Sequence, residues 1–243
     1  MELIAQGRTA DVFDLGDGRV LRRYRSGRSA ASEARVMRHL ETHGYPVPQV
    51  FDVDGGDLVL ERVQGATLFE LVANEPEQYE RYGRLLGELH ERLHRMPAPA
   101  WLVGGDGAGG DGAGGGLGEH GSAVIVHRDL HPENVLLSDR GPVVIDWDDA
   151  AAGRASVDAA ITVIVMLGAE LDVDAATAER ADPLRSLLVD AFLQTCGTDP
   201  RDGLAEAIAY RRRIPNNTDA ENRWLDEIAP DCLDAYFLQP SAR

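Results

Sequence analysis

The sequence predicts an α+β fold, with a small antiparallel sheet in the N-terminal part of the chain and mainly helices in the rest. Short alternating or β-branched runs, separated by turn residues, fill the first 63 residues. Beyond residue 75, apolar residues recur mostly at helical spacing. With 243 residues, 44% of them hydrophobic, the chain can bury one large core or two modest cores.

The N-terminal part is expected to hold five strands and one helix. The strands are predicted at residues 2–5, 10–15, 19–25, 49–53 and 57–63, and the helix at residues 29–43. In the third strand, alternation places Val20, Arg22 and Tyr24 on one face and Arg23 on the other. Gly7 lies in the first turn, which suits either an ordinary hairpin or a loop that covers phosphates.

Polar residues interrupt a series of apolar runs in the middle of the chain. The runs at residues 123–126, 135–137 and 143–145 predict buried strands. Asp129 and Asn134 lie between the first two, and Asp146 follows the third. Amide and carboxylate oxygens are ligands that Mg²⁺ prefers, and a further carboxylate can accept a proton from a hydroxyl. The spacing predicts a phosphoryl-transfer site in which Asp129 is the base and Asn134 and Asp146 hold Mg²⁺.

Two motifs resemble those of the aminoglycoside phosphotransferase and choline kinase-like family. They are residues 131–134, His-Pro-Glu-Asn, and residues 145–150, Ile-Asp-Trp-Asp-Asp-Ala. Protein kinases usually carry Lys at the position of His131 and Asp-Phe-Gly at residues 146–148, so the resemblance is to small-molecule kinases. It implies a bilobal protein-kinase-like fold, with a nucleotide-binding lobe at residues 1–63 and a catalytic, acceptor-binding lobe at residues 64–243.

The resemblance also implies the reactants. The donor would be ATP or GTP with Mg²⁺, and the acceptor a hydroxyl of a small molecule such as an aminoglycoside, an amino sugar or an amino alcohol. Arg22 stands where family members carry a phosphate-binding Lys or, in some branches, Arg, and Glu33 where they carry its acidic partner. Gly7 would begin the loop over the nucleotide phosphates, and Glu61 and Val63 would present main-chain atoms to adenine.

The cation of this site departs from the usual pattern because the chain contains no lysine, and all 24 basic residues are arginine. Arginine is planar and forked where lysine is a compact point charge, so the lysine geometry does not transfer unchanged. This departure and the glycine-poor first loop leave one alternative from another class, a nucleotide-binding pseudokinase or regulatory module. The presence of Asp129, Asn134 and Asp146 favours the enzyme.

A later segment, residues 153–158, resembles the family's Gly-Asp-Pro-x-x-Asp, although Arg154 and Ala155 depart from it. The resemblance implies that Asp158 braces the catalytic loop. An equally weighted interpretation is that Asp158 is an acid in the first turn of the following helix, where it complements the helix dipole.

Residues 90–94, His-Glu-Arg-Leu-His, match a zinc hydrolase motif in which two histidines bind the ion and the glutamate activates water. The motif lies on a predicted helix at residues 76–96, with an apolar stripe of Tyr82, Leu86, Leu89, Leu93 and Met96. Gly83 and Gly87 lie on the neighbouring stripe with the histidines, where another helix can approach closely. Packing is the favoured interpretation, and a zinc hydrolase is the alternative.

The remaining segments predict a helical C-terminal part. Residues 104–118 form a glycine-rich stretch, predicted to be a flexible loop inside the second lobe. Helices are predicted at residues 156–170, 183–196, 200–213 and 219–238.

The amino-acid composition limits the classes of partner that are expected. The net charge of −17 disfavours nucleic acid; it suits solubility and, as a second interpretation, attraction of a cationic acceptor. Two cysteines, Cys196 and Cys232, make no disulfide framework and suit a reducing cytoplasm. No signal peptide or membrane span is predicted. The oligomeric state does not follow from the sequence.

Overall fold

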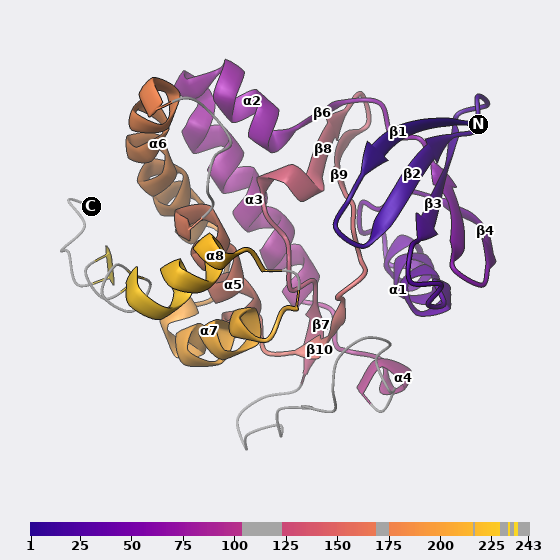
Figure 1. Cartoon of the computed structure of the whole chain (residues 1–243). Coiled ribbons are helices and arrows are strands. Elements are labelled where there is room, and N and C mark those ends of the chain that lie inside the picture. Colours follow the sequence, from indigo (N-terminus) through magenta and orange to yellow (C-terminus); the bar gives the residue numbers. More distant parts are fainter. Residues whose placement is uncertain (104–122, 169–174, 216, 229–232, 234–235, 238–243) are drawn as a thin grey trace. The chain divides into compact units, whose positions relative to one another are not determined.

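The computed structural model describes residues 1–103, 123–168, 175–215, 217–228, 233 and 236–237 (Figure 1), and the side chains of these except 175–183 and 227–228. The predicted glycine-rich loop at residues 104–118 lies outside the described residues. The chain divides into two compact units. The first comprises Met1–Glu70 and Met96–Ala152, and the second comprises Leu71–Arg95 and Gly153–Arg243. The lobe boundary after residue 63 stays a prediction.

The first unit contains a five-stranded antiparallel sheet of order β1-β2-β3-β5-β4. Its strands are β1 (Glu2–Gln6), β2 (Ala10–Asp14), β3 (Arg19–Tyr24), β4 (Val50–Asp54) and β5 (Asp57–Glu61). All five predicted strands are confirmed, with ends that shift by one or two residues. Helix α1 (Ala31–Thr42) buries Ala34, Val36, Met37 and Leu40 and packs beside β4. The predicted helix at residues 29–43 is therefore confirmed.

The three central apolar runs also form the predicted strands. β8 (Val135–Ser138) and β9 (Gly141–Val144) make a hairpin that continues a small sheet of order β6-β8-β9, with β6 at Ala66–Thr67. β7 (Val124–Val126) pairs with β10 (Ala151–Gly153). Two short helices, α2 (Leu68–Asn74) and α4 (Ala100–Val103), were not predicted. Ile125, Val135, Val143 and Val144 are completely buried, so the hairpin is anchored in the core.

The second unit is helical (Figure 1). Its elements are η1 (Pro76–Gln78), α3 (Tyr79–His94), α5 (Ala155–Gly168), α6 (Ala175–Leu193), η3 (Pro200–Gly203), α7 (Leu204–Arg212), α8 (Asp219–Arg223) and η4 (Trp224–Ile228). The predicted start of a helix at Pro183 is wrong. α6 begins at Ala175 and continues through that proline.

Helix α3 packs closely against α6, as its glycines predict. A Cβ atom on Gly83 would lie 2.6 Å from the Ala191 Cβ, and one on Gly87 would lie 2.5 Å from the Phe192 carbonyl oxygen. Both distances are shorter than real Cβ contacts, so only glycine fits at these positions. This packing fixes the rotation of α3 about its axis and therefore the direction in which its histidines point.

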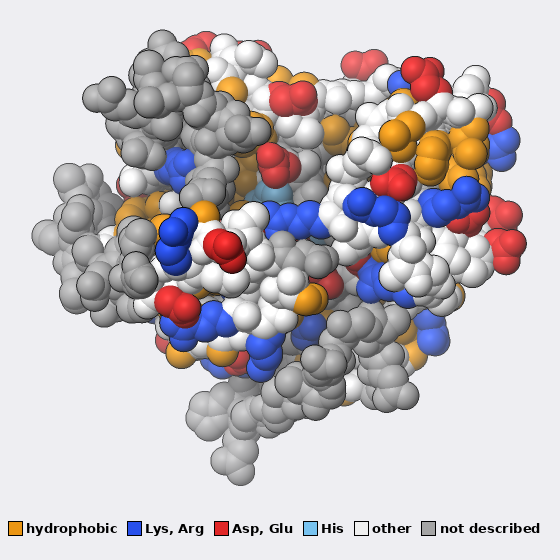
Figure 2. Space-filling view, viewed as in Figure 1, with side chains coloured by type: hydrophobic (Ala, Val, Ile, Leu, Met, Phe, Trp, Pro, Cys, Tyr) orange, Lys and Arg blue, Asp and Glu red, His pale blue; other side chains and the backbone are white. Residues whose placement is uncertain are grey.

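Three features of the chain are relevant to the kinds of partner that it can bind. No helix among the described residues is long and apolar enough to cross a membrane. Arginine and acidic side chains are interspersed on the face shown in Figure 2, rather than separated into fields of one sign. Edge strand β1 exposes Leu3 and Ile4.

Candidate active site

The register of the β8–β9 hairpin places two of the predicted site residues at one end of it. Val135 pairs with Val144, and the Ile145 amide donates to the Asn134 carbonyl oxygen at 3.0 Å. Asn134 precedes β8 and Asp146 follows β9 by two residues, so both lie at the same end of two paired strands. The sequence spacing predicted this arrangement.

Asp129 lies beside Asn134 in the loop that follows β7. The Asn134 side-chain nitrogen donates to the Asp129 carbonyl oxygen at 2.8 Å and lies 3.4 Å from the Asp129 Oδ2. Because the amide nitrogen makes these contacts, the amide oxygen is the atom oriented elsewhere and can ligate a cation. The Asp129 side chain is about one-third exposed. A carboxylate in that position can reach a substrate hydroxyl.

A buried histidine joins the Asp129 loop to the Asp146 segment. The Asp129 amide donates to His127 Nδ1 at 3.3 Å, which leaves the Nε2–H to donate to the Ile145 carbonyl oxygen at 3.0 Å. The Trp147 ring packs against the imidazole with centroids 4.5 Å apart, and its Nε1–H donates to the Val144 carbonyl oxygen. No sequence pattern indicates this connection, which holds the two segments in fixed relation.

Two residues of the site adopt left-handed backbone conformations. Arg128 has φ 69° and Asp146 has φ 64°. Such a conformation costs a non-glycine residue about 1 kcal/mol or more, and it persists only where the surroundings impose it. Here the His127 contacts and the β8–β9 pairing impose it.

Arg22 bridges the sheet, helix α1 and Asp146. Its Nη1 donates to Glu33 Oε1 at 2.6 Å and its Nη2 to Asp146 Oδ1 at 2.5 Å. Arg22 and Glu33 are buried, whereas the Asp146 side chain is 43% exposed. The predicted Arg22–Glu33 ion pair is thus present. Arg23 points the other way and pairs with Asp57 at the surface, which confirms the predicted register of β3.

The charges of this cluster follow from the pairing. Burial alone would lower the pKa of Arg22, but the Glu33 and Asp146 carboxylates outweigh it and raise that pKa. Burial raises the pKa of Glu33, and the Arg22 charge opposes that shift. Arg22 therefore stays cationic, and its planar fork contacts two carboxylates at once.

A second carboxylate of the segment, Asp148, is held by one group from strand β3 and two from N-terminal turns and loops. It accepts from the Tyr24 hydroxyl at 3.0 Å and the Thr9 hydroxyl at 3.3 Å, and it pairs with Arg28. The Tyr24 hydroxyl also lies 2.5 Å from Glu33 Oε2. These contacts link Asp148 to the Arg22 cluster.

Asp149 lies in a field of negative charge. Desolvation raises the pKa of Asp149, and the charges of Asp129 and Asp146 raise it further. The charges of Arg28 and Arg128 oppose this shift, so both carboxylates and guanidinium groups surround Asp149.

The other predicted nucleotide residues occupy ordinary backbone positions. The Gly7 amide donates to the Ala10 carbonyl oxygen at 2.9 Å, and Arg25 donates to the Gly7 carbonyl. The Glu61 amide donates to the Gln49 carbonyl oxygen, and the Glu61 carboxylate pairs with Arg140. Val63 is partly exposed just after β5. Roles in nucleotide binding stay predictions for all three.

Asn134 and Asp146 fit a magnesium site by donor type. Both offer oxygen atoms at one end of the hairpin, and Mg²⁺ is usually held by one or two such ligands together with substrate phosphates and water. Asp146 already attracts the Arg22 guanidinium at 2.5 Å, which shows that this carboxylate is placed to bind positive charge.

The chain matches the family model described as "Phosphotransferase enzyme family" over residues 1–108 and 116–190. It belongs to this family. Its fold is protein-kinase-like.

Known proteins with similar structures agree on the fold. The chain superposes on an ADP-bound aminoglycoside phosphotransferase APH(2'')-Ib with a TM-score of 0.58 and 11% identity, covering 93% of this chain and 91% of the other. For aminoglycoside phosphotransferase APH(4)-Ia in complex with AMP-PNP and hygromycin B, the TM-score is 0.56 and the identity 18%, with 98% and 94% covered.

A curated relative matches only part of this chain. The EKC/KEOPS complex subunit BUD32 of Yarrowia lipolytica is 27% identical over 142 residues, which is 56% of this chain. The chain spans about half the length of that relative, 53%.

Proposed function

We propose that this phosphotransferase moves the γ-phosphoryl group of ATP or GTP to a hydroxyl of a small, amine-bearing acceptor such as an aminoglycoside, an amino sugar or an amino alcohol. The observation that carries the proposal is the convergence of Asp129, Asn134 and Asp146 at one end of the β8–β9 hairpin, with Arg22 paired to Asp146. Nucleotide-bound structural neighbours support the donor.

Each residue has a distinct task in this proposal. Asp129 orients the acceptor hydroxyl and takes its proton as the new P–O bond forms, while the nucleoside diphosphate leaves. Asn134 and Asp146 would hold Mg²⁺, which neutralises charge on the phosphates when bound. Arg22, braced by Glu33, would contribute a fixed positive charge beside Asp146.

An amine on the acceptor suits the local charge. Asp129, Asp146 and Asp149 gather three carboxylates in one region of the first unit. A cationic acceptor would be attracted there, and the hygromycin B complex of a structural neighbour is consistent with an aminoglycoside-like acceptor.

The competing function is nucleotide binding without transfer. The Gly7 amide, which would face phosphates in a covering loop, is engaged inside its own turn, and no lysine is available. A pseudokinase would bind nucleotide through the residues assigned above and would transfer no phosphoryl group.

A transfer screen tests both the phosphotransferase proposal and the pseudokinase alternative. The protein is incubated with Mg²⁺, with ATP or GTP, and with a panel of aminoglycosides, amino sugars and choline-like alcohols, and phosphorylated products are detected by mass spectrometry. We expect one acceptor class to be phosphorylated, with the rate about 10²- to 10⁴-fold lower in Asp129→Ala. Nucleotide affinity should not change in this variant, because Asp129 is assigned to the acceptor.

The matched control is Asp139→Ala, which removes an exposed carboxylate from the turn of the same hairpin. It should transfer at the normal rate. Normal turnover in Asp129→Ala would exclude Asp129 as the base, and nucleotide binding with no product from any acceptor would favour the pseudokinase.

A further inference from the structure

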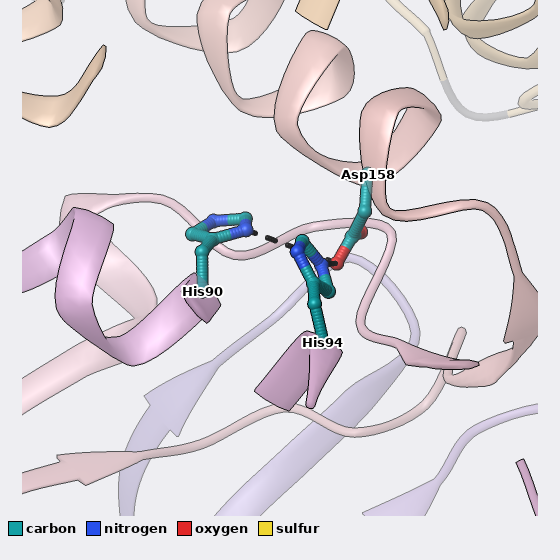
Figure 3. A group of neighbouring side chains, drawn as sticks. All are labelled: His90, His94 and Asp158. Carbon is teal, nitrogen blue, oxygen red and sulfur yellow. Dashed lines mark hydrogen bonds and ion pairs between the residues drawn. The ribbon is translucent and has the colours of Figure 1, made fainter. Parts of the chain in front are cut away.

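Three ionisable side chains meet inside the second unit, whereas the residues assigned to phosphoryl transfer belong to the first unit. His90 and His94 come from α3 and Asp158 from the first turn of α5 (Figure 3). One ligand atom from each lies within 4.8 Å of the others. His94 Nε2 is 2.9 Å and His90 Nδ1 is 3.9 Å from Asp158 Oδ2. The side chains of His90 and Asp158 are completely buried, and that of His94 is 7% exposed.

The cluster does not form the hydrolase that its sequence motif suggests. In such an enzyme the glutamate between the histidines activates a water molecule on the ion. Here Glu91 pairs with Arg95 at 2.6 Å, and its side chain is 38% exposed. A Cβ on Gly197 would meet the Glu91 side chain at 2.7 Å, so Glu91 packs against the loop after α6. The glutamate therefore lies away from the histidines, and burial closes the cluster to a substrate.

A buried carboxylate requires positive charge or several hydrogen bonds. The α5 N-terminus helps Asp158, and a His94 N–H can donate to it. A hydrogen bond accounts for the 2.9 Å contact, but the 3.9 Å separation from His90 is too long for one. His94 Nδ1 is also buried without a hydrogen-bond partner among the described residues.

Both separations suit ligands of a shared ion. Atoms bound to one zinc ion at about 2.0–2.2 Å lie roughly 3–4 Å from one another. His90 has a further feature of a metal ligand, because its other ring nitrogen, Nε2, lies 3.0 Å from the Thr162 hydroxyl. Hydrogen bonding of the second nitrogen is what fixes the ring orientation and tautomer of metal-binding histidines.

We propose that His90, His94 and Asp158 bind one divalent transition-metal ion of the zinc type, which joins α3 to α5. Two imidazoles and one carboxylate suit zinc and disfavour magnesium, so this site differs in chemistry from the Asn134–Asp146 pair. Three protein ligands leave one tetrahedral position for a water molecule. The ion has a structural role, since a closed site admits no substrate.

Metal titration of the full, untagged chain tests the site. The protein is stripped with a chelator, supplied with excess Mg²⁺ and titrated with Zn²⁺; bound zinc is measured by elemental analysis after gel filtration. We expect one zinc per chain despite the magnesium, and a higher melting temperature of the zinc-loaded protein. Cobalt in place of zinc should give the visible absorption of a site with nitrogen and oxygen ligands.

Three variants locate the ion. His94→Gln retains an N–H donor toward Asp158 but removes the imidazole, and it should lose stoichiometric zinc. Thr162→Val removes only the hydroxyl beside His90 and should weaken zinc binding about 10- to 100-fold. The control is His39→Ala, which removes a half-buried imidazole from the His39–His43 pair, whose ring centroids lie 4.3 Å apart. It should bind zinc normally.

Either of two results overturns the proposal. Wild-type protein that binds no zinc would leave a proton-mediated His94–Asp158 hydrogen bond as the whole interaction. Zinc retained at full stoichiometry by His94→Gln would place the ion elsewhere. If His94→Gln does not fold, three measurements still test the site. They are the zinc stoichiometry of the wild-type protein, its cobalt spectrum and the zinc affinity of Thr162→Val.

Discussion

Asp146 and Asp158 are two carboxylates with opposite surroundings. Asp146 is 43% exposed and pairs with a buried arginine, whereas Asp158 is completely buried and faces two histidines. Asp146 keeps a surface through which phosphates and a hydrated cation can arrive. Asp158 has none, so whatever neutralises it belongs to the folded unit.

The difference shows how motif matches should be weighed. Residues 127–146 and residues 90–94 both match catalytic patterns by spacing. Spacing predicts which side chains meet; accessibility decides whether a substrate can reach them. The first set satisfies both conditions, and the second satisfies only the first.

Removal of the exposed carboxylate should have the largest effect. Asp146→Ala deletes a proposed magnesium ligand, so we expect transfer to be abolished and Mg²⁺-dependent nucleotide affinity to fall. Calorimetric titration with nucleotide, with and without Mg²⁺, measures this. The variant should lose the magnesium dependence specifically. Asp158→Asn should leave nucleotide affinity and its magnesium dependence unchanged, and a loss there would erase the contrast between the two carboxylates.

Removal of the buried cation should mainly affect stability. Arg22→Ala leaves Glu33 buried without its ion-pair partner, so the free energy of unfolding should fall by about 3–5 kcal/mol. Urea denaturation measures it. Arg23→Ala removes an exposed arginine from the same strand and should change stability by at most about 0.5 kcal/mol. Equal effects of the two substitutions would contradict the assigned register of β3.

The substitution Arg22→Lys tests whether the forked guanidinium group is required. The guanidinium contacts Glu33 and Asp146 through different nitrogens, and a single ammonium cannot reproduce this geometry. We expect Arg22→Lys to lose one charged hydrogen bond, about 1.5–3 kcal/mol of stability. Transfer assays of this variant then show whether a point charge suffices for activity. Unchanged stability would mean that the second contact contributes nothing.

The smallest expected effect concerns the helix that carries the histidines. Gly87→Ala gains helix propensity of about 1 kcal/mol, but the new Cβ would overlap the Phe192 carbonyl oxygen. We expect a net loss of about 1–2 kcal/mol by thermal unfolding. Glu88→Ala, one residue along on the exposed face, should be close to neutral. A stabilised Gly87→Ala would show that α3 and α6 can separate.

The sequence predicted the elements that local patterns determine. Strands β7, β8 and β9 were predicted because β-branched runs end at polar residues, and Arg22 was placed by alternation along β3. Helix α2 was missed although its signal was present. Thr67 and Glu70 form reciprocal hydrogen bonds at its start, and the Thr-x-x-Glu pattern is visible in the sequence.

Other features could not be predicted because they depend on contacts distant in the sequence. Asp158 lies 64 residues from His94, and no periodicity connects them. The three groups that hold Asp148 come from the β1–β2 turn, from β3 and from the loop after β3, 120 or more residues away. The α6 start was predicted wrongly because proline is favoured at the first turn of a helix, whereas here the helix had already begun at Ala175.

The arginine at position 22 has a practical consequence for chemical labelling. A reagent that acylates a nucleotide-binding site needs an amine there, which a lysine side chain supplies and a guanidinium does not. This chain offers no lysine anywhere, and the Arg22 guanidinium is cationic, buried and shared between two carboxylates. An amine-directed reagent would therefore find no lysine side chain to label, either beside Asp146 or elsewhere in the sequence.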